Sequence, residues 1–87
     1  MKFDVAELVE AKRQINSTLH KLRQTVKTFE AKENAGRYKS QITLAKRRIQ
    51  AFELSVALIE REIKMILRNK ARYQILKSAY LTTLFTI

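Results

Sequence analysis

Basic side chains gather in two segments of this sequence that contain no acid, residues 37–48 and residues 64–77. Lysines and arginines in a row can contact successive phosphates or carboxylates, and on nucleic acid each phosphate contact releases a counterion. With Arg61, which shares a helical face with Lys64 and Arg68, these segments predict an anion-binding patch, and a solvated basic face without a ligand is the alternative. The predicted members of the patch are Arg37, Lys39, Lys46, Arg47, Arg48, Arg61, Lys64, Arg68 and Arg72.

The other residue types with useful chemistry are scarce. His20 is the single histidine, no carboxylate lies three or four residues from it, and the chain has no cysteine. The acids form no repeated Glu-x-x-His pattern of the kind that holds a di-iron centre in a helical bundle. No phosphate-binding loop or nucleophile motif is present. We therefore expect no catalytic residue, metal ligand or cofactor, no small-molecule substrate, and a protein that is not an enzyme.

One short segment resembles part of an enzyme family. Gly36-Arg37-Tyr38-Lys39 is similar to the stretch after the first helix of small all-helical chorismate mutases. Those enzymes form dimers and hold a dicarboxylate with arginine and lysine. The arginine–glutamate segment that should follow by about a dozen positions is missing, and Lys46-Arg47-Arg48 stands there instead. A small helical enzyme for an anionic substrate is therefore the least supported alternative.

The composition favours helices and an anionic partner. The 87 residues suit one domain, and their 46% apolar content is high enough for a packed core. Proline is absent and glycine occurs once, so the chain has almost no helix breakers and few turn residues for an all-β fold. The formal net charge of +10 favours nucleic acid or an acidic protein as partner.

The sequence carries no sign of export or membrane insertion. No signal-peptide pattern follows the N-terminus, and no stretch of about 18 uncharged apolar residues exists. The absence of cysteine suits a reducing compartment. We expect a cytoplasmic protein and no membrane association.

A first helix is expected over residues 4–32. Asp4 and Glu7 have the spacing of a capping box, and Phe3 and Leu8 that of a hydrophobic staple. Apolar residues then recur every three and four positions and form one seam, interrupted by Lys12 alone. The apolar members of this seam are Val5, Leu8, Ile15, Leu19, Leu22, Val26 and Phe29.

A turn at 33–37 and a second helix over 38–82 complete the predicted hairpin, with a kink or break allowed near Asn69. The second seam keeps the seven-residue spacing that is typical of coiled-coil packing, and a short turn makes the helices antiparallel. The second helix would reach roughly 70 Å and the first roughly 42 Å, so residues beyond about 66 have no counterpart. The second seam consists of Ile42, Ala45, Ile49, Phe52, Val56, Ile59, Ile63 and Ile66.

The second helix has a further apolar repeat on another face. Leu44, Ala51, Leu58 and Met65 recur every seven residues and form what we call the outer stripe. A helix that is apolar on two sides usually has neighbours on two sides, so we predict a homodimer closing as a four-helix bundle. A three-helix monomer and a foreign partner are the alternatives. The predicted interface consists of Leu44, Ala51, Leu58, Met65, Tyr73, Leu76, Tyr80 and Leu84.

Together these features predict a non-enzymatic helical interaction or scaffold module that self-associates and binds an acidic partner. The alternative of another class is a basic nucleic-acid-binding accessory or regulatory protein. The sequence does not identify the partner or the biological process.

Overall fold

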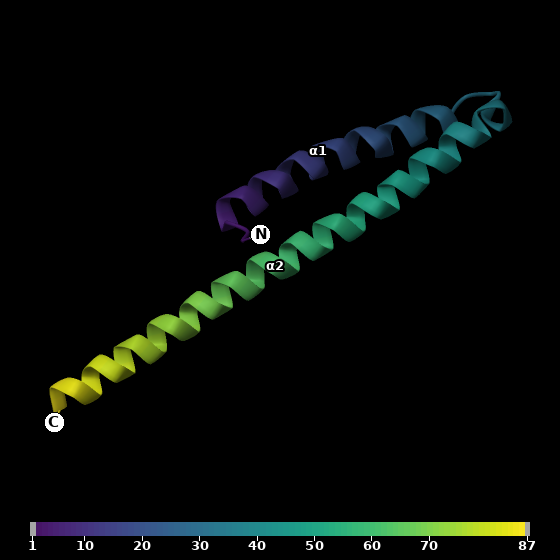
Figure 1. The fold of residues 1–87 in the computed structure, drawn as a ribbon. Helices are drawn as coiled ribbons and strands as arrows, with labels where there is room; N and C mark the ends of the chain where they lie inside the picture. Colours follow the sequence, from purple (N-terminus) through teal and green to yellow (C-terminus); the bar gives the residue numbers. More distant parts are fainter. Residues whose placement is uncertain (1, 87) are drawn as a thin grey trace.

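The chain forms an antiparallel helical hairpin with a much longer second helix (Figure 1). The computed structural model describes the backbone of residues 2–86 and the side chains of residues 2–79. Helix α1 spans Val5–Glu30, a 3₁₀ turn η1 spans Ala35–Tyr38, and helix α2 spans Lys39–Thr86. No strand occurs within residues 2–86. The predicted all-α class and the longer second helix are confirmed.

Helix α1 begins directly after Asp4, whose backbone is extended, as an N-cap residue requires. The Asp4 side chain makes no capping hydrogen bond, so the expected capping box is wrong. Its carbonyl oxygen instead accepts a hydrogen bond of 3.0 Å from the backbone N–H of Leu8, which closes the first helical turn. Phe3 and Leu8 line the same surface hollow, as two partners of a hydrophobic staple would.

The two predicted seams face each other along the hairpin. Every apolar seam residue is buried or half-buried, whereas most positions around the seams are exposed. The three- and four-residue spacing keeps each apolar set on one side of its helix, and the partner helix covers that side. Among the described side chains, those that are largely inaccessible to water are Leu8, Leu19, Val26 and Ala45. The core of the hairpin is therefore narrow and consists of the single layer of side chains between the two helices.

An aromatic cluster closes the turn between the helices. The rings of Phe29 and Tyr38 stack with their centroids 4.9 Å apart, and the Lys32 ammonium lies within 5.4 Å and 4.8 Å of the two centroids. The backbone N–H of Arg37 donates a 2.9 Å hydrogen bond to the carbonyl of Asn34. No residue of the described backbone has a positive φ, so the chain reverses without a left-handed residue. Stacking and cation–π attraction stabilise this end of the hairpin.

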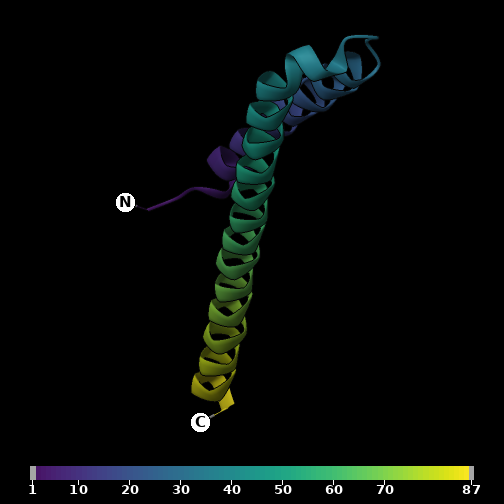
Figure 2. The ribbon, with the colours of Figure 1, turned by 90° about the vertical axis from the view of Figure 1, so that its right-hand side faces the viewer.

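Helix α2 continues past Asn69 without a break and extends beyond the region where α1 lies beside it. Figures 1 and 2 show its C-terminal part extending alone beyond the N-terminal end of α1. We call residues 67–86 the overhang. The molecule measures 79 × 21 × 15 Å, with a radius of gyration of 21.8 Å, whereas a compact domain of this length has about 12 Å. The elongation follows from the unequal helix lengths, 26 and 48 residues.

Candidate functional site

The outer stripe and the overhang leave large apolar side chains in water. Leu58 is 60% exposed and Met65 is 40% exposed, and Leu44 and Ala51 are also exposed. In the overhang, every described side chain from Leu67 to Ala79 is exposed, including the predicted interface residues Tyr73 and Leu76. The other two predicted interface residues, Tyr80 and Leu84, lie outside the side chains that the structure describes.

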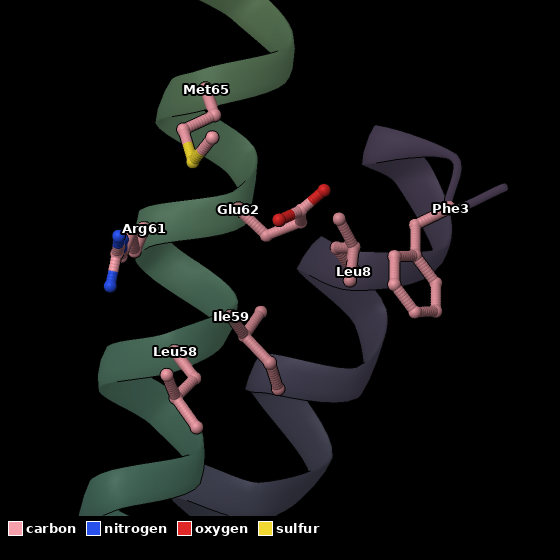
Figure 3. A pocket seen from close by; sticks show the side chains of 7 residues that line it. All are labelled: Phe3, Leu8, Leu58, Ile59, Arg61, Glu62 and Met65. Atoms are coloured by element: carbon pink, nitrogen blue, oxygen red, sulfur yellow. The ribbon is translucent and has the colours of Figure 1, made fainter.

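A shallow apolar hollow lies at the open end of the hairpin, where α1 begins and the overhang leaves it. Figure 3 shows its two sides, with Phe3 from the segment before α1, Leu8 from α1, and the others from α2. The Glu62 side chain points from α2 toward Leu8, and Arg61 points away from α1. We call this the open-end hollow, and it is lined by Phe3, Leu8, Leu58, Ile59, Arg61, Glu62 and Met65.

The predicted anion-binding residues are all exposed, but the structure does not bring them to one place. Arg61, Lys64 and Arg68 line one hollow on the outer side of α2, and we call them the basic row. Arg37 belongs to η1 and Lys39 begins α2, so roughly 36 Å of chain at the helical rise separates them from the basic row. The patch is therefore two surfaces, one near the turn and one near the overhang.

Lys46, a predicted member of the patch, has a carboxylate partner across the hairpin. Its Nζ lies 3.0 Å from Oε1 of Glu30 on α1. A second interhelical ion pair joins Arg23 Nη2 and Glu53 Oε1 at 2.8 Å. The signal for both pairs was present in the sequence, because each of the four residues directly follows an apolar residue of a seam. Such flanking positions meet across a helical pair.

Lys12, the single polar residue of the first seam, is also satisfied across the hairpin. Its Nζ lies 3.1 Å from Oε1 of Glu60, and both side chains are partly exposed. A lysine can lay its methylene stem along an apolar seam while its ammonium reaches a carboxylate at the edge. The interruption of the seam is therefore compatible with pairing of the two helices.

The one strongly shifted carboxyl group lies on α1, away from the basic row. Arg13 donates two hydrogen bonds of 2.9 Å to Glu10, and Gln14 donates a third. The arginine first, and then the amide, lowers the pKa of Glu10 to about 2, and the same contact raises the pKa of Arg13. Both groups are fully exposed, and the contact is local to one face of α1.

His20 is exposed and borders a hollow with Arg23, Lys27 and Lys46, a mostly basic setting. Within the described residues, no three side chains of the metal-binding types come together. In that same part of the chain, no helix is both long enough and apolar enough to cross a bilayer.

Three exposed surfaces are thus candidates for a functional site, namely the outer stripe with the overhang, the open-end hollow, and the basic row. Comparison of the chain with protein families, with curated proteins and with solved structures finds no match.

Proposed function

We propose that this protein is a non-enzymatic helical interaction module that self-associates through the outer stripe and the overhang of α2. The supporting observation is the overhang, whose apolar side chains are exposed at every position that the structure describes, from Leu67 to Ala79. Leu67, Tyr73, Ile75 and Leu76 are each at least half exposed there. Large apolar side chains exposed in such number on one short segment indicate an interaction site.

The surface area supports the same proposal. The chain exposes 7484 Å², whereas a folded monomer of 10.2 kDa exposes about 5300 Å². The excess, roughly 2200 Å² per chain, is of the size that each partner buries in an obligate homodimer. A dimer that covers the outer stripe and the overhang would bring the exposed area per chain close to that of a compact protein. A symmetric pair is the simplest closed assembly.

Solution mass tests the self-association. We expect the parent protein to sediment as a dimer, and Leu58→Glu to sediment as a monomer because it places a charge in the apolar contact. Leu44→Glu should weaken the dimer as well. Val9→Glu is the matched control, because Val9 is about as exposed as Leu44 but lies on α1. A monomeric parent at all concentrations, or a dimer that survives both α2 substitutions, would contradict the proposal.

The basic row is the surface that we propose for an acidic partner. Arg61, Lys64 and Arg68 are exposed, and none of them takes part in an ion pair among the described residues. Their spacing of about one helical turn matches a row of carboxylates on a partner helix. Leu54 and Ile75 are exposed on the same face, seven residues before Arg61 and seven after Arg68, which favours an amphipathic protein partner over a phosphate backbone.

Binding to poly-L-glutamate tests the acidic-partner proposal. Arg68→Glu should weaken binding about tenfold or more, because it replaces an attractive charge with a repulsive one. Lys21→Glu, with the same change of net charge on α1, should weaken it much less. Equal losses in the two variants would show that net charge alone attracts the polymer. Tighter binding to mixed-sequence duplex DNA or RNA, with a steep salt dependence, would favour the nucleic-acid alternative instead.

A further inference from the structure

We propose that α2 of a second copy pairs with α2 in an antiparallel direction, with Arg72 of the second copy opposite Glu62 in the open-end hollow. This inference rests on the self-association proposed above and adds its register. Its basis is the negative charge of Glu62. Glu62 is half-buried in the wall of an apolar hollow, and no ion pair among the described residues involves it. A carboxylate in such a place is stabilised by a cation that reaches it.

The side of α2 that carries Leu58 and Met65 of the outer stripe contains the positions that decide the register. Steps of three and four from Leu58 give Glu62, Met65, Asn69, Arg72 and Leu76, all on one side of α2. This side begins at the open-end hollow and continues along the overhang. Its members change from apolar and acidic near the hollow to basic and apolar farther along the helix.

In an antiparallel pair, the end of this side near the hollow in one copy faces the end on the overhang of the other copy. With a two-fold axis at the level of Leu67, Leu58 lies opposite the second copy's Leu76. The same register places Glu62 opposite its Arg72 and Met65 opposite its Asn69. Each contact occurs twice by symmetry, so one dimer gains two leucine pairs and two pairs of opposite charge.

The neighbouring registers lose these pairs. The heptad spacing allows shifts of one heptad at a time, because smaller shifts turn the stripe away from the second helix. One shift places Glu62 opposite Met65, and the shift in the other direction places it opposite Ala79. In the register shifted by two heptads toward the turn, Leu44 lies opposite Leu76 of the second copy. Arg72 then lies opposite the second copy's Arg48, and Glu62 lies opposite its Leu58. Like charges and a carboxylate against leucine both disfavour that arrangement.

In this register the overhang of the second copy would lie over the open-end hollow. Leu58, Met65 and Glu62 form one side of the hollow, and Phe3 with Leu8 forms the other (Figure 3). A helix lying along the outer stripe would bring its Arg72 and Leu76 to this hollow, where the apolar walls cover the leucine. Arg72, predicted from sequence as part of the anion-binding patch, is in this arrangement an interface residue.

Charge exchange tests the pair between Glu62 and Arg72. We expect Glu62→Arg and Arg72→Glu each to raise the dimer dissociation constant at least tenfold, measured by analytical ultracentrifugation. The double variant restores opposite charges and should return to within about threefold of the parent. Lys70→Glu is the matched control, since it makes the same change of charge two residues away on the other side of the overhang and should leave the dimer intact. Failure of the double variant to recover would overturn the assigned pair.

Disulfide cross-linking tests the register itself, and the cysteine-free chain gives a clean background. Leu58→Cys combined with Leu76→Cys should form covalent dimers under mild oxidation. The two positions are roughly 27 Å apart along one helix, which excludes a bond within one chain. Leu44→Cys combined with Leu76→Cys reports the alternative register and should stay uncross-linked. Cross-linking of that second pair alone in a dimeric protein would overturn the register only, whereas a monomeric parent would overturn self-association as well.

Discussion

The two halves of α2 have similar apolar content and very different surroundings. From Lys39 to Ile66 the helix lies beside α1, and its seam residues are buried or half-buried. In the overhang the same type of side chain is exposed, with Ile75 at 68% and Leu76 at 69%. The difference lies in what covers each half, because α1 is 26 residues long and α2 is 48.

The comparison separates what an apolar pattern indicates from what the lengths of the helices indicate. The pattern shows which face of a helix needs cover, and chain length shows whether the same molecule can supply it. In the first half of α2, the helix α1 covers the apolar face. In the overhang no other part of the described chain lies alongside, and this is the reason for proposing that a second molecule covers it.

The same substitution in the two halves of the hairpin should have unequal effects. Leu19 on α1 is 2% exposed, and Leu19→Ala should lower the free energy of unfolding by about 2–5 kcal/mol, the range for a buried leucine. Leu76→Ala should change it by less than about 0.5 kcal/mol at concentrations too low for association, as for a surface residue. Urea unfolding followed by circular dichroism measures both. A comparable loss in both variants would show that the overhang is covered within one chain.

A smaller effect is expected where the seam is interrupted. Lys12→Leu exchanges an exposed ion pair with Glu60, worth about 0.2–1 kcal/mol, for an apolar side chain in a half-buried seam position. We expect a gain in the free energy of unfolding of up to about 1 kcal/mol. Lys21→Leu, on the exposed side of α1, is the control and should give no gain. A loss of stability in Lys12→Leu would mean that the ion pair contributes more than the seam contact.

The sequence was sufficient for the architecture because the architecture depends on spacing. The seven-residue repeats, one glycine and no proline predict two long helices, and the only cluster of turn residues, around Asn34 and Gly36, separates them. The bounds of α1 differ from the prediction by one or two residues at its ends, where helices commonly fray. Spacing along one chain fixes which residues share a face, and the structure shows those faces as predicted in the seams.

The candidate site was less predictable because it depends on what lies across the hairpin. Lys46 stood in an acid-free segment, and its position beside the seam allowed a partner on the other helix, but only the folded chain identifies that partner as Glu30, 3.0 Å away. The stacking of Phe29 on Tyr38 likewise joins two residues on either side of the turn. Glu62 drew no attention in the sequence, because its importance comes from the apolar hollow that α1 and α2 form together. Contacts between elements require the third dimension, whereas faces of one element do not.

The smallest expected effect comes from acid titration, and it also separates the paired region from the overhang. The pKa of Glu10 is lowered to about 2 by Arg13, so the contact stabilises the folded state above pH 4.5, the ordinary value. That stabilisation is lost as the pH falls from about 4.5 through 2, since protonation removes the acceptor for Arg13. The overhang contains no acid, and its helix should not respond to this titration.

NMR titration of the side-chain carboxyl groups measures this directly. We expect Glu10 to titrate near pH 2 in the parent protein and to return toward 4.5 in Arg13→Ala, because the arginine is the largest cause of the shift. Thr25→Ala on the same helix, whose hydroxyl donates to the carbonyl of Lys21 and lies outside the Glu10 contact, should leave the value unchanged. Amide signals of residues 67–79 should stay constant over the same pH range. If those signals move together with Glu10, the overhang is coupled to α1, and the contrast between the two halves of α2 is weaker than their exposure indicates.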